Sequence, residues 1–163
     1  MKENARLKAW QQLSPAQQAQ VRAKRISAEQ IEFAGCGAKQ LDVVENEASD
    51  QLVGLAILDG QSVVGFLVLK RGTTLPPCAP VGAAIISGMR IDFAHQGRGF
   101  GSAALVLLRT WVKIHWHDCV ELLLSVDEEN HGGKKAYLRA GFEEIGKPEP
   151  GRIGLVRTMR MVL

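Results

Sequence analysis

The sequence predicts an α/β fold in which helices flank a mixed, mostly antiparallel central sheet. The Asp59-Gly60 dipeptide separates two apolar runs, 52–58 and 62–69, and this pattern is a strong signal for an antiparallel hairpin. Farther on, the strand-like run 83–93 leads through a glycine-rich turn into an apolar helical run. The chain has 163 residues and is 46% hydrophobic, so we expect a single domain over residues 1–163 with enough core to fold alone.

Helices are predicted between the chain start and the hairpin. Residues 6–13 fit either a first strand or a short helix. Ser14 and Pro15 have the residue types of an N-cap and first helical position, which predicts a helix through about residue 26. A second helix opens at Ser27, with Gln30 at the capping-box position, and ends near Gly35. A third is plausible over residues 38–47.

After the hairpin the pattern changes to strands alternating with helices. Prolines mark residues 72–82 as a loop, and the strand 83–93 has a bulge expected at Gly88. Further strands are expected at 121–126, 142–145 and 155–163, and a helix at 130–140 closed by Gly141. The helix that begins at residue 100 has one apolar face, made by Phe100, Ala104, Leu107, Leu108 and Trp111.

The run from His95 to Ser102 predicts an anion site, because glycines let the backbone aim successive N–H groups at one point and a helix start adds unpaired donors. The expected ligand is a phosphate or pyrophosphate. The run lacks the Gly-Lys-Ser/Thr of a P-loop and the last glycine of a dinucleotide fingerprint. It does fit Gln/Arg-x-x-Gly-x-Gly/Ala, through Gln96, Gly99 and Gly101. A tight strand-to-helix turn is the alternative interpretation.

A second segment strengthens this match. Asn130 is followed by Tyr137 and then by Gly141-Phe142. Together the two segments resemble the GNAT superfamily of N-acetyltransferases, in which the glycine loop binds the pyrophosphate of acetyl-CoA. The resemblance covers about residues 50–145. The sequence departs from the family at Gly133, where alanine is usual.

The resemblance implies an acetyl-CoA-dependent N-acetyltransferase that transfers the acetyl group directly. It also implies that Ile91 and Phe93 offer backbone groups to the pantetheine arm, that Asn130 binds nearby, and that Tyr137 is the general acid. The alternatives are a helix N-cap for Asn130 and core packing for Tyr137. The full set of expected cofactor-binding residues is Ile91, Phe93, Gln96, Gly97, Arg98, Gly99, Phe100, Gly101, Ser102 and Asn130.

The acceptor is expected to be a primary amine of a small molecule. A faint polyamine-type Gln-x-x-Phe segment at 30–33 makes Glu29 and Glu32 candidates for binding a cationic amine. The sequence leaves the general base open among Asp92, Glu121, residues 127–129, Glu29, Glu32 and water, with a solvated surface role as the alternative for each carboxylate. The resemblance implies that a backbone N–H of Ile91 or its neighbour is the oxyanion donor. Alternative functions are acetylation of an amino acid, an aminoglycoside or a protein N-terminus, or a regulatory acyl-CoA-binding domain. A catalytic Tyr137 argues against the last.

Composition argues against several partners. The net charge of +3 is mild and scattered, so we expect no nucleic-acid binding. No apolar run approaches the roughly 18 residues of a membrane span and no signal peptide is evident, which predicts a cytoplasmic protein without membrane contact. The three cysteines fit free thiols, and His115-x-His117-x-Cys119 matches no zinc spacing, so no metal is expected. A homodimer is left open.

Overall fold

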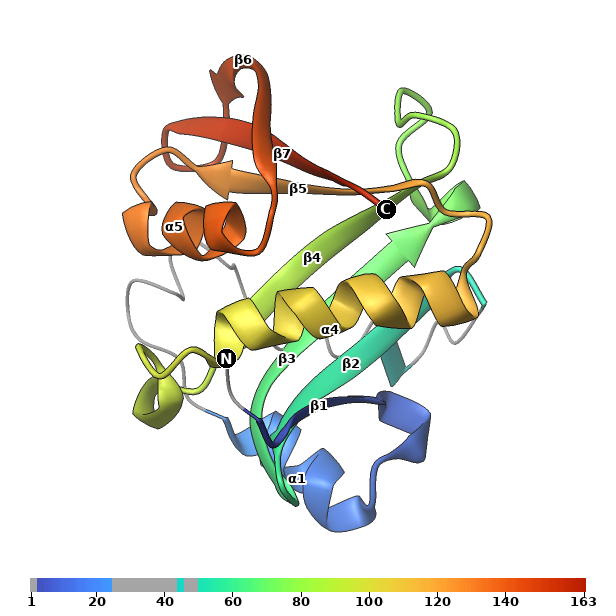
Figure 1. Ribbon diagram of the computed structural model, residues 1–163, viewed down its shortest axis with the longest axis vertical. Helices are drawn as coiled ribbons and strands as arrows, with labels where there is room; N and C mark the ends of the chain where they lie inside the picture. The colour runs from blue at the N-terminus through green and yellow to red at the C-terminus, as the bar shows by residue number, and fades with distance from the viewer. Residues whose placement is uncertain (1–2, 25–43, 46–49) are drawn as a thin grey trace.

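The fold is built on a seven-stranded sheet in the order β1-β2-β3-β4-β5-β7-β6 (Figure 1). The computed structural model of the protein describes residues 3–24, 44–45 and 50–163. Only the β4–β5 pair is parallel, which confirms the mixed, mostly antiparallel sheet. The strands are β1 (Ala5–Ala9), β2 (Leu52–Asp59), β3 (Ser62–Arg71), β4 (Ala83–Ile91), β5 (Glu121–Asp127), β6 (Glu143–Pro150) and β7 (Leu155–Val162). The helices are α1 (Pro15–Ala23), α4 (Phe100–His115) and α5 (His131–Arg139).

The N-terminal segment combines the two predicted alternatives, because β1 leads into a short 3-10 helix at Trp10–Gln12. The N-cap of α1 is confirmed: the Ser14 hydroxyl accepts from the Gln17 N–H at 3.1 Å, and the Gln17 side chain accepts from the Ser14 N–H at 3.2 Å. The helix ends at Ala23 rather than residue 26. The helices predicted over 27–37 and 38–47 lie outside the described residues, except for Val44 and Glu45.

The hairpin and the bulge are confirmed. The β2 and β3 strands pair through the Asp59-Gly60 turn, and the pairing of β3 with β4 shifts register between Phe66 and Val68, opposite Gly88. The predicted end of β4 at Phe93 is wrong. The strand stops at Ile91, because Phe93–His95 forms a 3-10 turn in which the His95 N–H donates to the Asp92 carbonyl at 2.8 Å.

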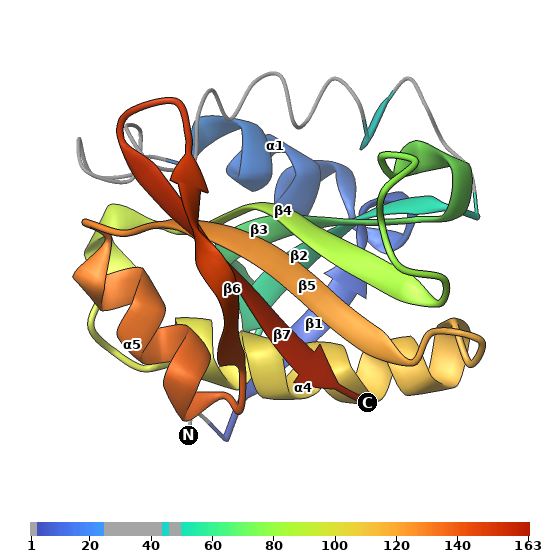
Figure 2. The same ribbon diagram turned by 90° about the horizontal axis from the view of Figure 1, so that it is seen from above.

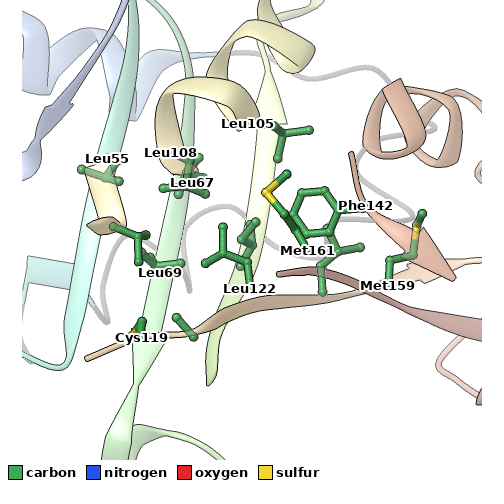
Figure 3. Close-up of a cluster of buried hydrophobic side chains, with 14 of the residues drawn as sticks. Leu55, Leu67, Leu69, Leu105, Leu108, Cys119, Leu122, Phe142, Met159 and Met161 are labelled. Atoms are coloured by element: carbon green, nitrogen blue, oxygen red, sulfur yellow. The ribbon is translucent and has the colours of Figure 1, made fainter. Parts of the chain in front are cut away.

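Helices cover both faces of the sheet (Figure 2). We call them the α4 face, which carries α4 and α5, and the α1 face, which carries α1. Figure 3 shows part of the core on the α4 face, where Leu105 and Leu108 pack on Leu67 and Leu122. The predicted apolar face of α4 packs on the core, with Phe100, Ala104 and Leu108 buried and with Leu107 and Trp111 half-buried against the core clusters. The buried residues of α4 are Phe100, Ala103, Ala104, Leu105, Leu108 and Val112.

The α1 face has a separate core. It is formed by Trp10, Leu13, Val21, Val44, Leu52, Ala56, Leu58, Val63, Phe66 and Val68. Phe66 is the largest of its fully buried side chains, and the Trp10 ring meets it edge-on at 6.1 Å between centroids. None of the described helices is long and apolar enough to cross a membrane.

The sheet opens between its two parallel strands. Residues 83–85 of β4 pair with residues 121–123 of β5. Beyond them β4 continues to Ile91 and β5 to Asp127 without further pairing to each other (Figure 1). The diverging ends therefore leave a gap in the centre of the sheet.

Candidate active site

A cavity of about 780 Å³ occupies the gap between the diverging ends of β4 and β5. Its walls come from residues 85–91 of β4, residues 124–127 of β5, the glycine loop and the first turn of α4, and α5. All the main segments that the sequence predicted to form a site therefore meet at one cavity.

The cavity is lined by both faces of the sheet. Strand residues alternate between faces, and contacts fix the phase: Ile91 packs with Phe100 and Ala104 of α4, whereas Arg90 lies over Phe66 on the α1 face. The lining residues on the α4 face are Ile86, Met89, Ile91, Leu124 and Val126. Those on the α1 face are Ile85, Ser87, Arg90, Ser125 and Asp127.

The main chain of Ile91 faces the gap. The Asp92 N–H donates to the Val64 carbonyl at 2.8 Å, so Asp92 and Val64 form a hydrogen-bonded pair of the β3–β4 ladder. In antiparallel pairing the next pair, Ile91 with Gly65, then directs its N–H and C=O groups away from the partner strand. The Gln96 side chain confirms this direction, because its Nε2 donates to the Ile91 carbonyl oxygen at 3.1 Å.

The glycine loop forms the mouth of the cavity on the α4 face. Gly97 and Gly99 have φ of 71° and 85°, a left-handed conformation that other residues rarely adopt, and Gly99 is the N-cap of the 16-residue α4. A Cβ atom at either position would meet nothing within 4 Å, so the space above the loop is open. Backbone N–H groups of the helix start and an open cradle fit a pyrophosphate well.

Not every residue of the predicted cofactor set lines the cavity. Ile91, Gln96, Gly97, Gly99, Gly101, Ser102 and Asn130 do, and Phe100 does so although its side chain is only 1% exposed. Arg98 does not line it and stacks on the Phe100 ring at 5.6 Å. Phe93 is 66% exposed, lies past the end of β4, and does not line it. The expected strand-like contact at Phe93 therefore has no support, because the chain has already turned.

The opposite wall is α5. The Asn130 side chain caps this helix by accepting from the Gly133 N–H at 3.0 Å, and Asn130 also lines the cavity. A Cβ atom at position 133 would lie 2.7 Å from the Asn130 amide nitrogen. Glycine in place of the usual alanine thus lets Asn130 fold closely over the helix start.

Tyr137 lies one turn farther along α5, and it both lines the cavity and packs on the core. Its ring meets the Phe142 ring edge-on at 5.9 Å between centroids. Burial raises the pKa of Tyr137 to about 12, so the phenol stays protonated at neutral pH. Its hydroxyl donates no hydrogen bond to a described residue and is available to a ligand.

Among the candidate carboxylates that the structure describes, Asp127 alone lines the cavity. The Asp92 carboxylate oxygen Oδ2 lies 3.0 Å from His95 Nδ1 and 3.7 Å from Lys24 Nζ. Glu121 lies at the paired end of β5, away from the gap. Glu29 and Glu32 lie outside the described residues, as does the 30–33 segment.

Glu128 belongs to an ion-pair network behind α5. Its carboxylate accepts from Lys134 at 2.9 Å and from Arg157 at 2.7 Å, and Lys134 also contacts Glu144 at 3.0 Å. Hydrogen bonds from Lys134 and then Arg157 hold the pKa of Glu128 below its ordinary value. The network ties the start of the Tyr137 helix to β6 and β7.

We expect Glu128→Gln to lower the melting temperature at pH 7. Because the folded-state pKa is lowered, the stabilisation by the ionised carboxylate is complete above the unfolded pKa of about 4.3 and is lost as the pH falls through the folded value. The difference in melting temperature between wild type and variant should therefore disappear below about pH 4. Glu129→Gln is the control, since that side chain is 85% exposed. A difference in melting temperature that persists unchanged at acid pH would contradict a stabilising role for the ionised Glu128 carboxylate.

The sequence reasoning missed Arg90. Its side chain is 6% exposed, lines the cavity on the α1 face, and has its Cζ 5.2 Å from the centre of the Phe66 ring. Burial lowers the pKa of Arg90, and its Nη1 has no hydrogen-bond partner. A charged residue inside an otherwise apolar strand run was the signal that could have found it. Lys135 and Arg139 of α5 and Ser125 of β5, which also line the cavity, were missed as well.

The described residues contain no group of three His, Cys, Asp or Glu side chains placed to hold a metal ion. His115 instead stacks on Trp111 at 4.3 Å between ring centroids, and Cys119 is buried in the core.

The structure is that of an α/β protein with a cavity between two diverging parallel strands. Residues 10–142 match the model of the Acetyltransferase (GNAT) family, so the chain belongs to that family. It is an acetyl-CoA-dependent N-acetyltransferase. It is 26% identical to the uncharacterized N-acetyltransferase YbbJ of Bacillus subtilis over 124 residues, which are 71% of this chain and 78% of the relative.

Solved structures share the fold. Spermidine N-acetyltransferase from Vibrio cholerae, in complex with CoA and spermine, aligns with a TM-score of 0.71 at 16% identity, over 98% of this chain and 95% of the other. Aminoglycoside acetyltransferase AAC(6′)-Ib with coenzyme A aligns with a TM-score of 0.73 at 14% identity, over 97% and 94%. The GNAT domain of PAT from S. lividans aligns with a TM-score of 0.70 at 22% identity, over 98% of this chain and 90% of the other.

Proposed function

We propose that the protein transfers the acetyl group of acetyl-CoA directly to the primary amine of a small molecule, within one domain that spans residues 1–163. The observation that carries this is the cavity through the gap in the sheet, which has the glycine loop and Tyr137 on one side and polar α1-face residues on the other. Two substrates can then reach one point from opposite faces. Proximity of this kind replaces a collision between two molecules with an effectively intramolecular step.

The residues that would hold acetyl-CoA lie along the α4 face. The backbone N–H groups of residues 96–101 and the Ser102 hydroxyl suit the pyrophosphate. The Ile91 N–H and C=O suit the amide groups of the pantetheine arm, provided that the Gln96 side chain releases the carbonyl it now contacts. When bound, acetyl-CoA supplies an acetyl group activated as a thioester. The Ile91 N–H is also the donor placed to stabilise negative charge on the acetyl oxygen.

Tyr137 is assigned the role of general acid. Tyr137 lines the cavity, and its raised pKa keeps the phenol protonated until negative charge develops nearby. On the α1 face, Asp127 is placed to bind the incoming ammonium group and to accept its proton, either directly or through a water molecule.

A panel of primary amines tests the proposal through the release of free CoA thiol from acetyl-CoA. We expect thiol release that depends on the amine and yields one N-acetylated product for each thiol. Tight binding of acetyl-CoA with no thiol release from any amine would contradict the proposal and favour a regulatory acyl-CoA-binding domain.

We expect CoA to stabilise the fold by mass action, by about 2.7 kcal/mol at a concentration 100 times its Kd. Dephospho-CoA should give a similar shift in melting temperature, because the loop grips the pyrophosphate that both molecules share. Adenosine, which lacks the pyrophosphate, is the matched control and should give little shift. Equal shifts from adenosine and CoA would be inconsistent with a pyrophosphate-binding loop.

A further inference from the structure

We propose that the acceptor amine carries a carboxylate, which the Arg90 guanidinium binds on the α1 face of the cavity. This inference rests on the proposed function and narrows it to amino acids and related amino carboxylates. It also separates the protein from acetyltransferases whose acceptors are purely cationic.

The first step is that Arg90 is a buried cation with no anionic partner among the described residues. It is 6% exposed, and no carboxylate of the described residues lies within ion-pair distance of it. Its Nη1 has no hydrogen-bond partner, although every guanidinium N–H is a donor. Buried charges are ordinarily paired, because removing a charge from water is costly. The contact with the Phe66 ring offsets only part of that cost.

The second step is that Arg90 belongs to the cavity rather than to a closed core. It lines the wall on the face opposite the glycine loop, so the group it binds is not the pyrophosphate. A planar guanidinium matches the two oxygens of a carboxylate, and a charge-assisted pair of this kind would be strong because the Arg90 side chain is largely buried from water.

The third step is the charge pattern around Arg90. Asp127, on the neighbouring strand and on the same face, is the only carboxylate among the described lining residues. On the α1 face the lining therefore carries one cation, Arg90, and one anion, Asp127, whereas Lys135 and Arg139 belong to α5 on the other face. This pair of charges complements a molecule with an ammonium at one end and a carboxylate at the other. A polyamine would place positive charge near Arg90, and like charges there are unfavourable.

The test compares acceptors that differ only in charge. Wild-type protein is assayed by thiol release with lysine and lysinamide, and with 4-aminobutyrate and 4-aminobutanamide, while putrescine represents cationic diamines. For at least one pair we expect kcat/KM for the carboxylate to exceed that for its amide by about 30-fold or more, mostly through KM. Arg90→Gln should remove this preference, and Arg90→Lys should retain part of it.

The outcomes separate the two proposals. If wild type acetylates the amides or putrescine as well as the carboxylates, the inference about Arg90 is wrong while the acetyltransferase function stands. If no amine supports thiol release, the proposed function itself fails. CoA binding measured by calorimetry shows whether each Arg90 variant is folded. If a variant is not folded, the comparison of carboxylate and amide acceptors with the wild-type protein still tests the inference about Arg90.

Discussion

Tyr137→Phe is expected to lower kcat by roughly 10²- to 10⁴-fold, while the affinity for acetyl-CoA stays near that of wild type. The substitution keeps the ring and its edge-on contact with Phe142, and removes only the hydroxyl of this cavity-lining residue. The fold should therefore be unaffected, and the loss should appear in turnover. Steady-state kinetics and calorimetry with acetyl-CoA measure the two quantities separately. If the variant turns over at the wild-type rate, Tyr137 is not the general acid and its role is core packing.

The pH dependence gives an independent check on Tyr137. Burial raises its pKa to about 12, so the phenol remains protonated across the usual assay range. Any loss of rate between about pH 7 and 10 must then come from another group. The Phe variant should show a lower rate with a profile of the same shape. An alkaline limb in that range which disappears in the variant would show that the phenol titrates much lower.

Gly99→Asp is expected to weaken CoA binding by about a hundredfold or more, because it places a carboxylate beside the pyrophosphate. Gly99 is the N-cap of α4 with a φ of 85°, and the first N–H groups of a helix have no partner within the helix. The side chain would enter open space rather than the core, since a Cβ there meets nothing within 4 Å. Calorimetric titration with CoA measures the effect.

Two further variants isolate the cause of this loss. Gly99→Asn has nearly the same size and tolerates left-handed φ about as well, so the difference between the two variants reports the charge. Gly60→Asp, at a φ of 61° in the turn between β2 and β3, tests for a general effect of aspartate at such positions. Equal loss in the Asp and Asn variants would show that backbone strain, and not charge, governs binding.

Local signals predicted most of the elements. The hairpin follows from Asp59-Gly60 and the start of α1 from Ser14 and Gln17, because in each case neighbouring residues determine the geometry. The glycine loop and the Tyr137 helix were placed by their motifs, which are also local in the chain.

The faces of β4 were not predicted, although the bulge at Gly88 was. Simple alternation from Ile86 would put Arg90 on the α4 face and Ile91 on the other. The extra residue at the bulge reverses this order, so that Ile91 packs under α4 and Arg90 turns to the α1 face. The separation of β4 from β5 was also missed, because it depends on long-range pairing that ends at Ile85.

The two-sided cavity has a consequence for how such an enzyme can diversify. In the proposed function, main-chain groups on the α4 face supply most of the contacts to acetyl-CoA, whereas side chains on the α1 face bind the acceptor. Under that proposal, mutations at Ser87, Arg90 or Ser125 would alter which molecule is acetylated without disturbing the groups that hold acetyl-CoA. Descendants of one ancestral scaffold can acquire new acceptors one side chain at a time, and the same positions are natural targets for directed evolution.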